Sequence, residues 1–191
     1  GVPRPAAATS LPRDSQWDDK ALSTRIAAAI KGQHTVPDRL NWELFLRVAP
    51  KVDDHPIYHP FNWRGWVDWG QGALGDMGAH LIDHPFWSLK LGYPTSIETI
   101  STPFNRVCYP HATTTYYDFP ARKGMPAVKL VWYDGGMMPP KPDELGEEHP
   151  APDGGSMYAG SKGKMLQETY GERPRLLPAE RHNSYGAPKE K

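Results

Sequence analysis

A glycine-rich segment, 70–83, carries the residues whose types and spacing most suggest chemistry: Gly-Gln-Gly-Ala-Leu-Gly-Asp-Met-Gly-Ala-His-Leu-Ile-Asp. Asp76 and His80 are four positions apart, so a helix would place them on one face. A carboxylate beside an imidazole orients one ring nitrogen and makes the other more basic, which suits a general acid/base. The glycines would let another backbone or a planar ligand approach closely. A helix cap with a hydrogen-bonded core histidine explains the same spacing, and spacing alone favours that interpretation.

Histidine pairs in this part of the chain raise the alternative of a metal site. Two pairs are each separated by four positions: His55 with His59, and His80 with His84. A catalytic zinc site needs three protein ligands in a set geometry, and the sequence has no His-Glu-x-x-His motif. Prolines beside or inside these pairs disfavour regular helical spacing. The sequence therefore predicts no metal site.

An aromatic loop precedes the glycine-rich segment and reads Tyr58-His59-Pro60-Phe61-Asn62-Trp63-Arg64-Gly65-Trp66. Aromatic rings stack on the apolar faces of sugars, while Arg and His donate hydrogen bonds. The loop is therefore a candidate sugar platform. Alternatively, Trp63 and Trp66 anchor the core beneath a long loop, and we expect one tryptophan in each role. These two residues alone also raise the possibility of a carbohydrate-binding module, which is a function class of its own.

Helices must position these residues. Apolar residues at helical spacing predict a helix over 73–91, which Pro85 should kink or split near Asp83. A short helical turn is expected over 41–46, with Asn41 as its N-cap.

Strands follow the helices. The last two predicted strands flank a hairpin turn, Gly160-Ser161-Lys162-Gly163, and the lysines near that turn are expected to be solvated. The predicted strands cover 96–101, 113–119, 127–133, 156–159 and 164–167. Loops, then a helix, then four or five strands predict an α+β fold with an open, mainly antiparallel sheet and helices on one face. No β-α-β unit and no Gly-x-Gly-x-x-Gly after a strand are visible, so this sequence makes no dinucleotide fold by itself.

Length and composition set the organisation of the chain. A length of 191 residues suits one domain, and 21 Pro with 18 Gly predict a loop-rich structure. The 7 Trp argue against disorder. We expect an irregular segment over 1–40 that contains a short helix at 18–31, an α/β domain over 41–170, and an extended tail over 171–191.

Charge and cysteine content exclude several classes. Lys+Arg and Asp+Glu both total 22, and this zero net charge argues against a nucleic-acid partner. No apolar run approaches the roughly 18–20 residues that cross a bilayer. Cys108 is the single cysteine, so an internal disulfide framework is excluded, and no Cys/His pattern marks it as a nucleophile.

Several strings, spread over most of residues 37–180, resemble the Gfo/Idh/MocA family of oxidoreductases. The likeness is greatest to the bacterial branch whose members often carry twin-arginine export signals, which leaves the bacterial cytoplasm and the periplasm both open as compartments. The strings are Tyr58-His59-Pro60, Trp63-Arg64-Gly65-Trp66, residues 68–80, Phe86-Trp87, residues 91–96, residues 128–136 and Gly160-Ser161-Lys162-Gly163-Lys164.

The resemblance implies the C-terminal domain of an enzyme whose N-terminal Rossmann domain binds NAD or NADP, and whose open sheet often forms the oligomer interface. Family substrates are sugars, cyclitols and related polyols or their keto forms. The family's Asp-x-x-x-His pair falls on Asp76 and His80. His80 would be the general acid/base at the carbinol carbon during hydride transfer, and Asp76 its orienting partner or a substrate ligand. From their position, we expect Tyr58, Arg64 and Trp66 to form the substrate wall.

The sequence departs from the family pattern by lacking the Rossmann half, its glycine-rich loop and the family's Glu-Lys-Pro lysine. Residues 13–35 read as an insertion, and the chain is expected to be either a fragment or a stand-alone subunit. Two function classes follow. The first is the substrate-binding and catalytic domain of an NAD(P)-dependent sugar or polyol oxidoreductase, with the cofactor held by the absent domain and none bound by this chain alone. The second is a non-catalytic interaction subunit, in which the sheet mediates a homo-oligomer or a larger complex.

Overall fold

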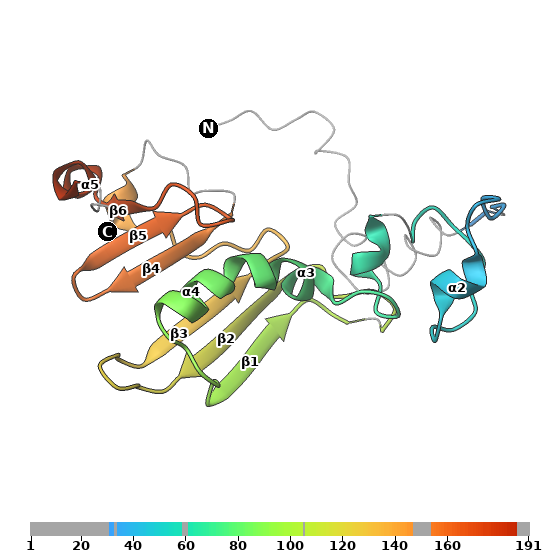
Figure 1. Ribbon diagram of the computed structural model, residues 1–191, viewed down its shortest axis with the longest axis horizontal. Coiled ribbons are helices and arrows are strands. Elements are labelled where there is room, and N and C mark those ends of the chain that lie inside the picture. The colour runs from blue at the N-terminus through green and yellow to red at the C-terminus, as the bar shows by residue number, and fades with distance from the viewer. Residues whose placement is uncertain (1–30, 33, 59–60, 105, 147–153, 187–191) are drawn as a thin grey trace, which may run out of the picture. The chain divides into compact units, whose positions relative to one another are not determined.

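The computed structural model describes residues 31–32, 34–58, 61–104, 106–146 and 154–186 (Figure 1). The chain divides into two compact units. The first unit comprises Gly1–Asp76 and Ile100–Thr113, and the second comprises Met77–Thr99 and Thr114–Lys191.

The described helices are short, and local sequence signals explain their ends. The helical elements are α2 (Trp42–Leu46), the 3-10 turn η2 (Asn62–Gly65), α3 (Gly72–Leu81), α4 (Asp83–Ser88), the 3-10 turn η3 (Asp143–Leu145) and α5 (Ala179–Tyr185). Asn41 caps α2 as predicted, because its side-chain oxygen accepts a hydrogen bond from the Leu44 amide at 3.0 Å. Within the described ranges, none of the helices has the length and apolar character needed to cross a membrane.

The predicted break in the long helix is confirmed. Helix α3 ends at Leu81 and α4 begins at Asp83, so Ile82 separates them. Pro85 lies in the first turn of α4, where a missing amide hydrogen leaves no helical bond unmade.

Two three-stranded sheets follow, each with antiparallel pairing. The strands are β1 (Ser96–Ser101), β2 (Thr113–Phe119), β3 (Val128–Tyr133), β4 (Ser156–Gly160), β5 (Gly163–Gln167) and β6 (Arg175–Leu177). The sheet orders are β1-β2-β3 and β4-β5-β6. Antiparallel pairs join β2 to β3, β4 to β5, and β5 to β6. These sheets together with the helices confirm an α+β fold.

The hairpin between β4 and β5 forms at the predicted turn, where Gly160 pairs with Gly163. Its sheet has a small apolar core in which Met157 packs against three buried leucines: Leu145, Leu166 and Leu177. Lys164, which we expected to be solvated, instead makes an ion pair with Glu144, with 2.7 Å between Nζ and Oε2. That contact ties η3 to β5.

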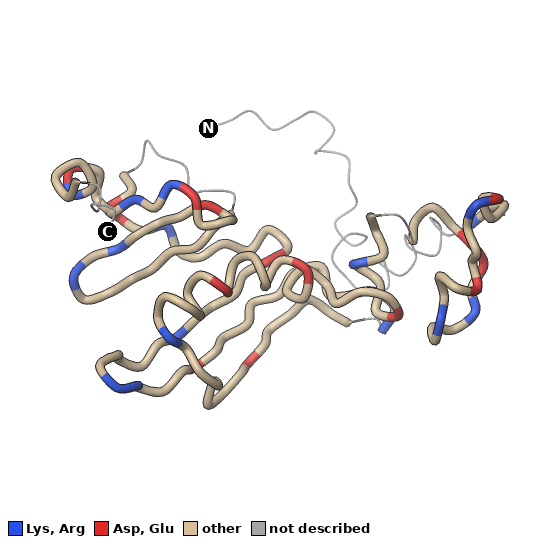
Figure 2. The backbone as a smooth tube through the Cα atoms, viewed as in Figure 1, with Lys and Arg blue, Asp and Glu red and all other residues tan. Residues whose placement is uncertain are grey.

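The two ends of the chain were expected to hold a short helix over 18–31 and an extended tail over 171–191. The segment expected to be an extended tail, 171–191, contains β6 and α5 in its described part, because Leu177 is buried in the second sheet's core. The structure there differs from the expectation. Most of the helix expected over 18–31 lies outside the described residues. Acidic and basic residues both occur along the described backbone, as the red and blue segments of Figure 2 show.

Candidate functional site

Five aromatic side chains pack together in the first unit and form what we call the aromatic cluster: Trp42, Phe45, Tyr58, Trp66 and Trp69. The ring centroids of Tyr58 lie 4.8 Å from those of both Trp66 and Trp69, in edge-to-face geometry. Trp42 stacks on Phe45 at 5.0 Å. Such pairs stabilise beyond the area they bury. The cluster therefore forms an apolar centre beneath the loop that precedes α3.

Hydrogen bonds fix this loop to the cluster. The indole of Trp66 donates to the Ile57 carbonyl at 3.1 Å, and that of Trp42 donates to the Val52 carbonyl at 2.8 Å. Burial raises the pKa of Tyr58, and the nearby acidic side chains raise it further. The tyrosine therefore stays neutral across the physiological range.

The two tryptophans of the loop have different environments. Trp66 is 7% exposed and Trp63 is 40% exposed. We expected one tryptophan to anchor the core and one to face ligands, and Trp66 has the surroundings of a core anchor. Tyr58 is equally buried, at 6%. The placement of Tyr58 and Trp66 in a substrate wall stays a prediction.

Arg64 connects the loop to helix α3. Its guanidinium lies over the Phe61 ring, 3.7 Å from the centroid, and its Nε donates to the Phe61 carbonyl at 3.1 Å. Its Nη1 donates to Asp76 Oδ2 at 2.5 Å. The side chains of Arg64 and Asp76 are 33% and 31% exposed. The predicted site residues Arg64 and Asp76 are therefore in direct contact, at a position that solvent reaches.

A distant segment holds the backbone around Arg64 in place. The amide of Val67 donates to the Val107 carbonyl, and that of Tyr109 donates to the Gly65 carbonyl, both at 3.0 Å. The Tyr109 hydroxyl donates to the Gly70 carbonyl at 3.0 Å. A Cβ on Gly70 would lie 2.3 Å from the Arg64 carbonyl oxygen, so only glycine fits there. The expectation that a glycine permits close backbone approach is met at Gly70.

Helix α3 carries both members of the predicted acid/base pair. The helical register places Asp76 and His80 four residues apart on one face. His80 is exposed and packs against the ring of Tyr170, with centroids 5.3 Å apart and planes at 80°. Sequence reasoning did not identify Tyr170, because no local pattern connects it to α3.

His84, on helix α4, lies beside the turn that follows β5 and contains Tyr170. A Cβ on the neighbouring Gly171 would lie 2.9 Å from His84 Nε2. The Nδ1 atom of His84 is buried and has no hydrogen-bond partner among the described residues. Since His80 and His84 both contact the turn after β5, their spacing is explained by packing.

The described residues include no group of three or more His, Cys, Asp and Glu side chains that could hold a metal ion, and His59 lies outside them. Both described sheets pair antiparallel strands, so they offer no parallel β-α-β unit with a glycine-rich turn to bind a pyrophosphate.

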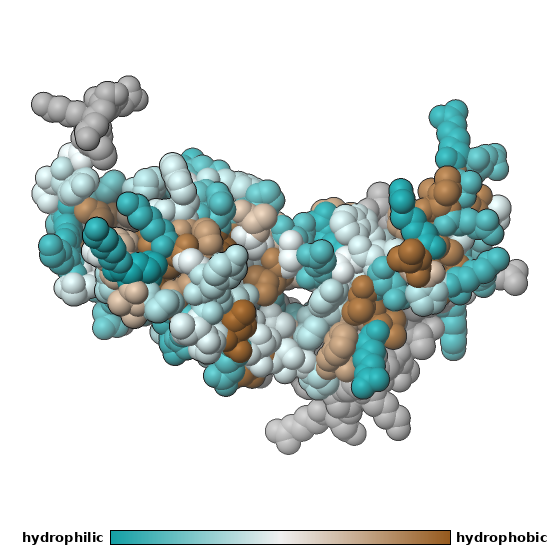
Figure 3. Space-filling view, turned by 60° about the horizontal axis from the view of Figure 1, so that its bottom comes forward, coloured by the Kyte–Doolittle hydropathy of each residue, from teal (hydrophilic) through white to brown (hydrophobic). Residues whose placement is uncertain are grey.

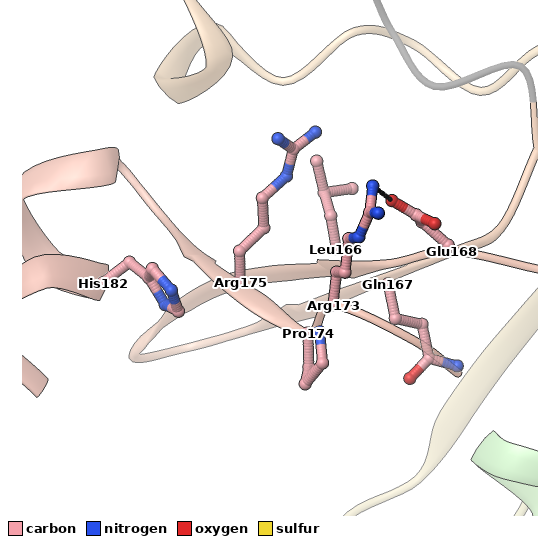
Figure 4. Close-up of a pocket in the computed structure, with 7 residues that line it drawn as sticks. All are labelled: Leu166, Gln167, Glu168, Arg173, Pro174, Arg175 and His182. Atoms are coloured by element: carbon pink, nitrogen blue, oxygen red, sulfur yellow. Dashed lines mark hydrogen bonds and ion pairs between the residues drawn. The ribbon is translucent and has the colours of Figure 1, made fainter. Parts of the chain in front are cut away.

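A cavity of about 330 Å³ lies in the second unit (Figure 4). Arg173, Arg175 and His182 contribute to its wall, and Arg173 Nη1 lies 3.2 Å from Glu168 Oε1. Figure 4 shows Arg173 and Arg175 rising on the side of β5 that carries Leu166. None of the residues predicted for the site lines this cavity.

Part of the chain is similar to a known family. Residues 24–99 match the family described as "Oxidoreductase family, C-terminal alpha/beta domain". The matched range contains the aromatic loop, the Arg64–Asp76 contact and all of helix α3. No curated protein matches the sequence.

Proposed function

We propose that this chain, whose residues 24–99 match the C-terminal α/β domain of the Gfo/Idh/MocA oxidoreductase family, is the substrate-binding and catalytic half of an NAD(P)-dependent oxidoreductase acting on a sugar or polyol. In this proposal the cofactor is held by a separate dinucleotide-binding domain. The observation that carries the proposal is helix α3, which places Asp76 and His80 on one face.

His80 is the proposed general acid/base. Its imidazole is exposed, so a hydroxyl group of a bound polyol can reach it. When the carbinol carbon loses its hydride to NAD(P)⁺, the imidazole would accept the hydroxyl proton. In the reverse direction, as the carbonyl carbon regains the hydride from NAD(P)H, the imidazole would return that proton to the carbonyl oxygen. Imidazole suits this role because its unperturbed pKa is about 6.5.

Asp76 and Arg64 are the proposed substrate ligands beside it. The ion pair between them fixes the orientation of the guanidinium. Contacts among the described residues use Nε and Nη1 of Arg64, which leaves Nη2 to donate to substrate hydroxyls. Tyr58 and Trp66 are buried in the aromatic cluster, and in this proposal they support the loop that carries Arg64.

The test measures NAD⁺ or NADP⁺ reduction across a panel of hexoses, pentoses and cyclitols, using the natural protein with its dinucleotide-binding domain present. We expect turnover with at least one polyol, and we expect His80→Ala to lower kcat by about 10²–10⁴-fold, the usual contribution of a general acid/base. His111→Ala is the matched control, because His111 is also exposed and lies outside α3. Retained turnover in His80→Ala, or no turnover with any polyol, contradicts the proposal.

Association through the first sheet is a second proposed function that a specific observation favours. Every residue of β1 is exposed, and β1 is at one end of the sheet order. Ile97 and Ile100 are 60% and 58% exposed, and their side chains point to opposite faces of the strand. An exposed apolar edge strand is prone to pairing, and apolar residues also lie at the surface in Figure 3.

The test is the mass in solution, measured by light scattering and compared with the chain mass of 21.4 kDa. We expect a multiple of this mass, and we expect Ile97→Lys to reduce it to that of a monomer. Val48→Lys is the control, since Val48 is fully exposed and lies outside the sheet. A monomeric mass for the unaltered chain rules out self-association, and the interaction class then requires a different partner.

A further inference from the structure

We propose that Tyr170 belongs to the substrate site, where its ring positions the imidazole of His80 and its phenol hydroxyl binds a hydroxyl group of the polyol. The inference rests on the proposed function and extends it to a residue far along the chain from α3. Tyr170 also lies outside the range that matches the family, 24–99.

The contact between the two rings is the first observation. The His80 and Tyr170 centroids lie 5.3 Å apart with planes at 80°, which is the favoured edge-to-face geometry. An exposed histidine at the end of a helix would otherwise sample several rotamers. The tyrosine ring removes part of that freedom. Since Tyr170 is 60% exposed, the contact leaves most of its side chain open to solvent.

The turn that presents Tyr170 is built by several hydrogen bonds. The Glu168 amide donates to the Glu172 carbonyl at 2.9 Å, and the Gly171 amide donates to the Glu168 carbonyl at 3.0 Å. The Tyr170 amide donates to Glu172 Oε2 at 2.9 Å. The backbone of Tyr170 is therefore held from both sides.

Packing between the second sheet and the α3–α4 region holds this turn against His80. The Ser156 hydroxyl, on β4, donates to the Leu81 carbonyl at the end of α3, at 3.4 Å. Gly171 has φ of +84°, and a Cβ there would lie 2.9 Å from His84 Nε2. A side chain at this position would be strained and would press on His84. Glycine is therefore what allows the turn to approach α4 and place its neighbour over His80.

The chemistry of a phenol suits a polyol beside a general acid/base. A tyrosine hydroxyl both donates and accepts hydrogen bonds, and polyols present hydroxyls on adjacent carbons. While His80 exchanges a proton with the reacting oxygen, Tyr170 hydrogen-bonds the oxygen of a neighbouring carbon. Tyr170 transfers no proton in this step. It is a positioning residue toward His80 and a binding residue toward the substrate.

The geometry is tested without activity, by NMR on this chain. The ring current of Tyr170 changes the chemical shifts of the His80 ring protons. Tyr170→Leu should therefore alter these chemical shifts, and Tyr170→Phe should leave them nearly unchanged. Tyr185→Leu is the control, because Tyr185 is 68% exposed in the same unit. His80 signals that do not respond to Tyr170→Leu overturn the ring contact. Both tyrosines are surface residues, so these variants should keep the fold.

The role is tested by kinetics of the protein with its dinucleotide-binding domain. Tyr170→Phe should raise KM by roughly threefold to tenfold through loss of one hydrogen bond, with kcat little changed. Tyr170→Leu should lower kcat as well, and this loss should be absent in the Phe variant because the ring is retained. If both variants match the unaltered enzyme while His80→Ala abolishes turnover, the role of Tyr170 is wrong and the proposed function stands. If His80→Ala retains turnover, the proposed function itself fails.

Discussion

Arg64 Nη1 lies 2.5 Å from Asp76 Oδ2, and this contact joins the 3-10 turn η2 to helix α3. The same guanidinium lies over the Phe61 ring. Asp76 is thus held by a cation from its own unit, at a place where both side chains are about one-third exposed. In the proposed function, Asp76 and Arg64 form a hydroxyl-binding pair and His80 exchanges the proton.

The first prediction concerns the energy of this ion pair. A double-mutant cycle with Arg64→Met and Asp76→Asn should give a coupling free energy of about 0.5–1 kcal/mol, because partial solvent exposure screens the charges. Methionine keeps an apolar stem over Phe61 while it removes the charge. The measurement is urea unfolding of the unaltered chain, both single variants and the double variant. Additive changes in the unfolding free energy would mean that the contact contributes nothing in solution.

The second prediction separates core from surface tryptophans. Trp66→Ala should lower the unfolding free energy by about 3–5 kcal/mol, since a large buried ring leaves a cavity. Trp87→Ala should change it by less than about 0.5 kcal/mol, because Trp87 is 83% exposed. Chemical unfolding followed by far-UV circular dichroism gives both values. A small effect of Trp66→Ala would argue that this ring is available to ligands after all.

The third prediction tests the glycine that meets the Arg64 backbone. Gly70→Ala should destabilise the chain by about 1–3 kcal/mol, because the added Cβ would lie 2.3 Å from the Arg64 carbonyl oxygen. Gly65→Ala is the control, since nothing lies within 4 Å of a Cβ there. Thermal unfolding of the two variants makes the comparison. Equal melting temperatures would show that the backbone can move away without cost.

The fourth prediction is a dependence of stability on acid pH. The hydrogen bond from Lys164 lowers the pKa of Glu144 below its ordinary value. A lowered folded-state pKa means that the contribution to stability is complete above the unfolded value of about 4.3 and is lost as pH falls through the folded-state pKa. The stability difference between the unaltered chain and Glu144→Gln should therefore shrink on acidification.

Urea midpoints at neutral pH and near pH 3 measure that difference, where pH 3 is about one unit below the unfolded carboxyl pKa. Glu98→Gln serves as the control, because Glu98 lies on the exposed strand β1. If Glu144→Gln is as stable as the unaltered chain at neutral pH, the contact with Lys164 does not stabilise the folded state.

Much of the local structure followed from the sequence because it depends on neighbours along the chain. Asn41 starts α2, Pro85 separates α3 from α4, and the turn from Gly160 to Gly163 forms the β4–β5 hairpin. Each rests on interactions spanning only a few residues. The glycine-rich segment also indicated α3 and, with it, the helical register of Asp76 and His80.

Local sequence patterns predicted the α+β class and the helix that carries Asp76 and His80. The resemblance seen in the sequence agrees with the family match over residues 24–99. The tertiary structure decided which partners meet those residues. It placed Arg64 on Asp76, Tyr170 on His80, and Trp66 inside the aromatic cluster. These contacts join segments far apart in the chain, and the packing of loops and sheets that brings them together leaves no periodic signal in the amino-acid order.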